Sequence, residues 1–208
     1  MEIDYTGKVK DTGKIFDSNI KKNIDKIGLK VPAKPFIFSL GQGMFLEGVD
    51  KFLIGKETGK EYTLDLPAEK AFGVRDTKII QVVPLQLFKQ NNINPSIGST
   101  LNFDGKTGKI LSVSGGRVRV DFNHPLAGKD IVYDLKVLRK VDKKQEQVEA
   151  FNEFIFKKKL KFEIKDKKLI LEVEKQLVPL ANLFKDKYKE LFDLDLEVKE
   201  VEVVDKKE

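Results

Sequence analysis

Hydrophobic and polar residues alternate along several short segments of the first 74 residues, which is the pattern of half-buried β-strands. The alternation is clearest in Ile3–Val9, and it returns in Phe36–Leu40 and Glu61–Leu66. Gly, Pro and Asp separate these segments, and such residues favour turns. Gly48–Ile54 instead has apolar side chains at helical spacing and stops at Gly55, which predicts a short helix. This region therefore predicts a β-rich unit with one short helix.

Residues 75–130 have a different pattern. They begin with the apolar run Ile79–Pro84 and continue as strands separated by glycines up to Phe122. The turn-forming stretch Asn123–Lys129 then leads to an alternating run, Ile131–Val137. Nothing in the inserted segment accounts for this last strand, but it would complete the sheet begun before residue 75. The sequence therefore predicts a discontinuous first domain, residues 1–74 plus 131–140, interrupted by a small β domain at residues 75–130.

A third unit follows Arg139, where the composition shifts to dense mixed charge and residues 140–144 are typical of a linker. Apolar residues recur at helical spacing in Val148–Phe156 and in Leu177–Phe192, with a predicted hairpin between them and a last strand over Leu196–Val203. An α-β-β-α-β unit of this size, residues 141–208, is marginal as an isolated core. Burial against a second copy is one remedy, so we expect a homodimer through this domain.

Composition excludes some classes of chemistry. The 208 residues carry 39 Lys and Arg against 33 Asp and Glu, and this modest excess does not by itself favour nucleic acid as a partner. There is no cysteine, so disulfides and thiolate chemistry are excluded. His124 is the only histidine, so no metal site is expected. Without a long apolar segment or a signal peptide, we expect a cytoplasmic protein that does not enter the membrane.

Six short motifs occur in order along residues 1–140. They are Tyr5-Thr6-Gly7, Ile15-Phe16-Asp17-Ser18, Pro35-Phe36-Ile37-Phe38, Gly43-Met44-Phe45-Leu46-Glu47-Gly48, Ala71-Phe72-Gly73 and Val132-Tyr133-Asp134. With the return stretch Asn123–Lys129, they resemble the SlyD-like FKBP-type peptidyl-prolyl isomerases, and the order of elements in the tail resembles the long archaeal-type FKBPs. The resemblance implies an α+β fold: an FKBP-type antiparallel sheet wrapped on a short helix, an inserted small β domain and a C-terminal α-β-β-α-β domain.

The resemblance also implies a shallow apolar pocket that receives proline. The residues at pocket positions are Tyr5, Phe16, Asp17, Phe36, Phe45, Leu46, Val49, Phe72 and Tyr133. In this family the backbone amide at the position of Leu46 holds a substrate carbonyl, and Asp17 would rim the pocket and orient Tyr5 or the substrate. The residues alone leave two alternatives open: an ordinary core for the apolar side chains, and a turn cap formed with Ser18 for Asp17.

For residues 75–130, the resemblance implies a domain that holds unfolded chains by hydrophobic contact and by pairing along strand edges. The residues that would contact clients are Ile79, Ile80, Val82, Val83, Leu85, Leu87 and Phe88. The alternative is that they form the core of the insertion. We predict a peptidyl-prolyl isomerase that is also a folding chaperone for unfolded or nascent polypeptides, with a holdase of little isomerase activity as the alternative.

Two pocket positions depart from the family pattern. Phe72 stands where many relatives have a tyrosine whose hydroxyl bonds the substrate, and Val49 replaces the large aromatic floor of some members. We therefore predict activity with weaker binding at this pocket, where a macrolide inhibitor is also expected to bind. The His- and Cys-rich tail of some SlyD-like proteins is absent, so no metal and no cofactor is expected.

Overall fold

Five strands form an antiparallel sheet, here called the main sheet, in the computed structural model, which describes residues 1–201. The strands follow the order β2-β1-β9-β4, and β3 also pairs with β1. Their bounds are β1 Glu2–Val9, β2 Ile15–Ser18, β3 Phe36–Ile37, β4 Glu61–Leu66 and β9 Ile131–Arg139. Strand β9 lies between β1 and β4, so the chain returns to the centre of its first sheet after an excursion of more than sixty residues. The predicted mixed α/β class with antiparallel sheets is confirmed.

Two helices and one 3-10 turn accompany the main sheet: α1 (Lys21–Ile27), α2 (Glu47–Leu53) and η1 (Ala68–Lys70). Val49 and Leu53 of α2 are fully buried and belong to the apolar cluster that contains Tyr133 and Leu135 of β9. The sequence pattern predicted α2 but not α1. Helix α1 spans only seven residues and buries a single one, Ile24, so its periodic signal is weak.

A second sheet, the middle sheet, is built from β5 (Ile80–Pro84), β6 (Thr100–Phe103), β7 (Lys106–Ser114) and β8 (Arg117–Asp121). The order is β5-β8-β7-β6, so β5 and β6 are its edges. The short turn η2 (Thr77–Ile79) precedes β5, and the helix α3 (Leu85–Gln90) follows it. Side chains of Phe88, Ile110, Val118 and Val120 form a separate small core.

Helix α3 changes one sequence prediction. Its six residues are too few to show a helical period, so Leu85, Leu87 and Phe88 were grouped with the preceding strand. In the structure Phe88 is 3% exposed and belongs to the core of the middle sheet, not to an exposed client surface.

Two chain segments connect the main and middle sheets, and hydrogen bonds join them. The side chain of Asn123 accepts from the amide of Asp76 at 2.8 Å and donates to its carbonyl at 2.9 Å. The amide of Gly128 donates to the carbonyl of Gly73 at 2.8 Å. These hydrogen bonds hold the two connecting segments side by side.

A third sheet, the C-terminal sheet, contains β10 (Phe162–Lys165), β11 (Lys168–Glu174) and β12 (Asp195–Val201). Strands β10 and β11 are antiparallel, whereas β11 and β12 are parallel. The accompanying helices are α4 (Lys144–Phe156), α5 (Val178–Leu183) and α6 (Lys185–Phe192), with the short turn η3 (Lys175–Leu177). The single helix predicted over Leu177–Phe192 is divided at Phe184, and the end of the predicted last strand, residues 202–203, lies outside the described residues.

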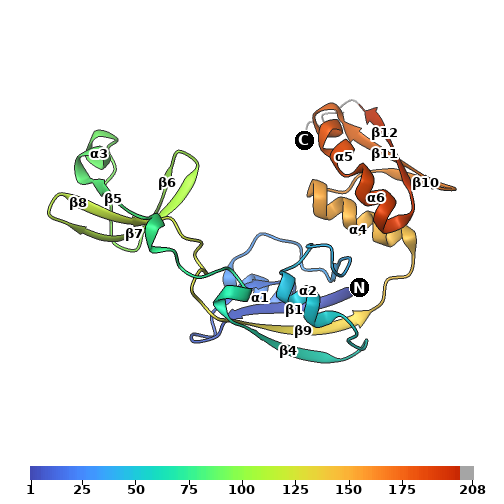
Figure 1. Ribbon diagram of the computed structural model, residues 1–208, viewed down its shortest axis with the longest axis horizontal. Helices are drawn as coiled ribbons and strands as arrows, with labels where there is room; N and C mark the ends of the chain where they lie inside the picture. Colours follow the sequence, from blue (N-terminus) through green and yellow to red (C-terminus); the bar gives the residue numbers. More distant parts are fainter. Residues whose placement is uncertain (202–208) are drawn as a thin grey trace.

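The C-terminal unit packs against the main-sheet unit. Phe38 and Met44 belong to the same continuous apolar cluster as Phe151 of α4 and Phe192 of α6. The stretch predicted as a linker contains Val141, which is buried. In Figure 1 the main sheet lies between the middle sheet at one end and the C-terminal helices and strands at the other. No helix among residues 1–201 has the length and apolarity needed to cross a membrane.

Candidate functional site

Aromatic side chains from distant parts of the sequence converge over one face of the main sheet. The ring of Phe45 lies 5.0 Å from Tyr5, 5.4 Å from Tyr133 and 5.7 Å from Phe36, measured between ring centroids. The ring centroid of Phe16 lies 5.8 Å from that of Tyr133 and 5.7 Å from that of Phe72. These separations are typical of edge and tilted aromatic contacts. The six rings are here called the aromatic cluster.

Gly7 makes this convergence possible. It lies opposite both Asp17 and Tyr133 in the sheet. A β-carbon at Gly7 would lie 2.7 Å from the ring of Phe16 and 2.9 Å from that of Tyr133, which is closer than real side chains approach. Only glycine therefore leaves room for both rings above β1.

The predicted pocket residues divide into a floor and a rim. Tyr133 is 2% exposed and Val49 is fully buried, so these two lie beneath the others as part of the core. Tyr5, Phe16, Phe36, Phe45, Leu46 and Phe72 are half-buried and pack against that core. The arrangement is an apolar surface with partly accessible aromatic edges, and no strongly nucleophilic group is among the predicted residues.

Asp17 and Tyr5 form the polar edge of the cluster. The hydroxyl of Tyr5 donates to Oδ1 of Asp17 at 3.3 Å. Burial raises the pKa of the Asp17 carboxyl above its ordinary value. Burial, and then the nearby Asp17 charge, raise the pKa of Tyr5, so its hydroxyl stays protonated and keeps donating. Asp17 also has a hydrogen bond with the backbone of Ser18, so each of the two roles considered for it has a contact in the structure.

The loop before α2 carries Phe45 and Leu46. Leu46 is the N-cap residue of α2, where backbone amides have no acceptor within the helix. Asp50, which is 3% exposed, accepts from the amide of Gly43 at 3.2 Å and so fastens the loop to the helix. Sequence reasoning missed Asp50. The available signal was a carboxylate at helical spacing with the apolar residues Leu46 and Leu53.

His124 is a second residue whose position the sequence did not reveal. Its ring stacks on that of Phe72, with 4.7 Å between the ring centroids and an interplanar angle of 8°. Its Nδ1 accepts from the amide of Leu126 at 3.2 Å, which orients the ring. The return stretch therefore contacts the aromatic cluster directly.

The seven apolar residues predicted to contact clients are not equivalent. Ile79, Val82 and Leu87 are exposed, and Val82 retains 57% of its surface. Val83 and Leu85 are half-buried against the small core that contains Phe88, and Ile80 is half-buried in β5. The exposed members lie on or beside the edge strand β5. A further exposed apolar residue, Ile97, is 70% exposed and was not among the predicted residues.

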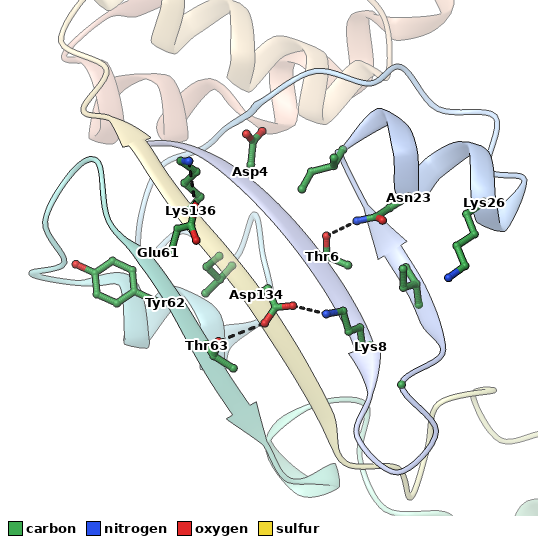
Figure 2. Close-up of a pocket in the computed structure, with 14 residues that line it drawn as sticks. Asp4, Thr6, Lys8, Asn23, Lys26, Glu61, Tyr62, Thr63, Asp134 and Lys136 are labelled. Carbon is green, nitrogen blue, oxygen red and sulfur yellow. Dashed lines mark hydrogen bonds and ion pairs between the residues drawn. The ribbon is translucent and has the colours of Figure 1, made fainter.

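A cavity of about 940 Å³ lies over the opposite face of the main sheet (Figure 2). Its lining residues Thr6, Lys8 and Asp134 alternate along β1 and β9 with the residues of the aromatic face. Lys8 pairs with Asp134, which also accepts from Thr63 at 3.2 Å. Lys136 likewise pairs with Glu61 in this lining, so the cavity is a charged surface separate from the aromatic face.

Comparisons with known proteins give one family match and several relatives. The family described as "FKBP26, IF domain" matches residues 81–126. A "Short-type peptidyl-prolyl cis-trans isomerase" of Methanocaldococcus jannaschii is 34% identical over 140 residues, which cover 66% of this chain and 88% of that protein. An "FKBP-type 16 kDa peptidyl-prolyl cis-trans isomerase" of Escherichia coli is 36% identical over 110 residues, which cover 50% of this chain and 73% of that protein.

A SlyD protein of Helicobacter pylori, also named an FKBP-type peptidyl-prolyl cis-trans isomerase, is 26% identical over 151 residues, 71% of this chain and 76% of that protein. The archaeal match covers most of its relative at an identity that establishes homology. The chain therefore belongs to the FKBP-type peptidyl-prolyl cis-trans isomerases, with SlyD-like relatives and a segment of the FKBP26 IF type, and it is an enzyme of that activity.

Proposed function

We propose that this protein isomerises Xaa-Pro bonds in unfolded or partly folded polypeptides and also holds such chains as a chaperone. In this proposal residues 1–74 and 131–140 form the catalytic domain, and residues 75–130 form the domain that captures clients. Residues 141–208 are a third domain. The proposed location, the cytoplasm, is a prediction from composition.

The observation that carries the isomerase assignment is the aromatic cluster. Twisting a peptide bond destroys amide resonance and costs about 18–20 kcal/mol. The uncatalysed isomerisation of proline takes about 10–100 s. A turnover of about 10 s⁻¹ thus needs only about 3–4 kcal/mol of differential stabilisation. The twisted amide is less polar than the planar one, so a dry aromatic surface favours it without any covalent step.

Each residue then has a role in this step. The rings of Tyr5, Phe16, Phe45 and Tyr133 exclude water around the proline. The backbone amide of Leu46, the N-cap residue of α2, holds a substrate carbonyl, as the family resemblance implies. The hydrogen bond from Tyr5 to Asp17 fixes the rim. No proton needs to leave the protein, which fits the raised pKa of Tyr5.

The chaperone assignment is supported by the edge strand β5. Its exposed Val82, with Ile79 and Leu87 nearby, offers apolar contacts next to unpaired backbone groups. A client held there is kept close to the aromatic cluster, which raises its effective concentration at the catalytic surface.

Refolding of a proline-limited protein tests both activities together. We expect the full chain to accelerate the slow phase. Replacing residues 76–129 by a short glycine-serine loop should abolish this effect but leave isomerisation of a proline tetrapeptide intact. The replacement is feasible because Gly73 and Gly128 are hydrogen-bonded neighbours. Suppressed aggregation without any rate effect on either substrate would favour the alternative, a holdase.

We also propose that the protein is a homodimer through residues 141–208. Leu183 at the end of α5 is 76% exposed, which is the largest exposure among the large apolar side chains of residues 1–201. The expectation came from the small size of this unit as an isolated core, and in the structure that core is continuous with the core of the main-sheet unit. Sedimentation of the Leu183→Asp variant tests the proposal: the wild type should be a dimer and the variant a monomer, and a monomeric wild type would end it.

A further inference from the structure

A groove of about 540 Å³ lies between the main-sheet unit and α4 of the C-terminal unit. One wall is the segment between α1 and β3, including Val31, Pro32 and Pro35. The opposite wall is α4, including Ala150 and Phe154. This volume is in the range of sites that bind small ligands or short peptide segments.

Helix α4 presents two different faces. Val148, Phe151 and Phe156 are buried in the core. Glu146, Glu149, Ala150, Glu153 and Phe154 recur every three or four residues on another face, and all line the groove. The small side chain of Ala150 and the partly exposed ring of Phe154 give this wall an apolar strip.

The carboxylates of the groove are paired with cations. Each of its four carboxylates already has a cationic partner: Glu2 and Glu146 pair with Arg139, Glu149 with Lys159, and Glu153 with Lys34. The pair between Lys34 and Glu153 also ties the two walls together. Lys157 also lines the groove, where its ammonium lies 4.5 Å from the ring centroid of Phe154. The exposed apolar side chains of the groove include Val31, which is 48% exposed.

The groove is continuous with the catalytic surface through Phe36. This residue lines the groove, and its ring also lies 5.7 Å from Phe45 and 6.2 Å from Tyr5 in the aromatic cluster. A polypeptide whose proline lies on the cluster therefore reaches the groove when it passes Phe36.

We propose that this groove is an extended subsite that binds the client residues next to the proline and selects uncharged, apolar side chains there. The inference rests on the proposed isomerase site. It gives the C-terminal unit a direct part in substrate selection, because one wall of the subsite belongs to α4. Peptides long enough to span both sites should bind better than a tetrapeptide.

The test compares kcat/KM for a proline tetrapeptide and for a peptide of about twelve residues that continues with Leu and Val on both sides of the same core. Val31→Lys and Ala150→Lys introduce charge from opposite walls of the groove. The matched control is Ile54→Lys, since Ile54 is 62% exposed and lines neither the groove nor the aromatic cluster.

We expect both groove variants to lower kcat/KM for the long peptide about three- to tenfold, mainly through KM, as for the loss of one partly buried apolar contact. The tetrapeptide rate and the control should not change. Equal rates for wild type and variants on the long peptide, or equal losses on both peptides, would overturn the subsite. If the wild type accelerates neither peptide, the proposed isomerase site itself fails.

Discussion

Gly7 shows how one residue without a side chain determines the geometry of the aromatic cluster. Its missing β-carbon leaves space that the rings of Phe16 and Tyr133 occupy. Phe16 in turn contacts Phe72, so a shift at Gly7 should be transmitted along the rim. Alternation of polar and apolar residues cannot reveal this, because glycine has no polarity to read.

Gly7→Ala should therefore lower both stability and catalysis. Overpacking typically costs about 1–3 kcal/mol, and the displaced rings should reduce kcat/KM for a proline tetrapeptide. Gly108→Ala is a matched control in the middle sheet, where a β-carbon would lie 2.5 Å from Val120. It should lower stability without changing tetrapeptide catalysis. Equal catalytic losses in the two variants would show that the positions of the rings of Phe16 and Tyr133 do not determine catalysis.

Phe72→Tyr should strengthen substrate binding. A hydroxyl added at the rim can bond a substrate carbonyl, and one such bond contributes about 0.5–1.5 kcal/mol, or roughly a two- to tenfold lower Kd for a proline peptide. Titration calorimetry gives the affinity, and Phe52→Tyr, outside the cluster, is the control. Unchanged affinity in Phe72→Tyr would show that this ring does not face the substrate.

Asp17 links the site to the pH dependence of stability. Because burial raises its pKa, the folded protein holds this proton more tightly than the unfolded chain does. The stabilising contribution is therefore complete below the ordinary carboxyl pKa and is lost as pH rises through the folded-state pKa. Asp17→Asn cannot ionise but still accepts from Tyr5.

The Asp17→Asn variant should thus have a higher Tm than the wild type at neutral pH, and the gap should close as the pH falls below the ordinary carboxyl pKa. Thermal unfolding followed by circular dichroism over this pH range measures the gap. A Tm difference that does not depend on pH would show that packing, and not the ionisation of Asp17, causes it.

At the scale of elements, the long alternating strands were predictable and the short helices were not. Strands β1, β4 and β9 and helix α2 lie where the polarity pattern placed them. Helix α3 spans six residues, fewer than two turns, and its buried Phe88 was therefore assigned to a surface. Strand β3 is only two residues long, and its pairing continues by one further residue, because Phe38 exchanges hydrogen bonds with Met1 at the start of the chain.

The edge strand β5 should be the element that binds clients. Val82→Lys puts a charge on its exposed face and should weaken binding of an unfolded protein about tenfold, the loss of one buried valine contact. Light scattering of an aggregating client measures the effect, with Ile54→Lys as an equally exposed control. If the Val82→Lys variant suppresses aggregation as well as the wild type does, clients do not bind at this strand.

At the scale of the whole molecule, sequence periodicity could not show how the parts meet. The buried position of Val141 and the shared cluster of Phe38, Phe151 and Phe192 depend on tertiary contacts between segments over one hundred residues apart. The positions of the pocket residues came from family resemblance, since periodicity alone favoured an ordinary core. In the structure Tyr133 and Val49 are core residues, and the rings of the other predicted pocket residues are half-buried around them.

The most direct test of the central claim is the rate of cis–trans exchange in a proline tetrapeptide, measured by NMR exchange spectroscopy with wild type, Phe45→Ala and Phe52→Ala. Phe45 contacts Tyr5, Phe36, Phe38 and Tyr133, whereas Phe52 contacts Tyr62 outside the cluster. We predict that the wild type and Phe52→Ala accelerate exchange and that a folded Phe45→Ala loses at least about tenfold of that rate. A folded Phe45→Ala variant that catalyses as fast as the wild type would contradict the account.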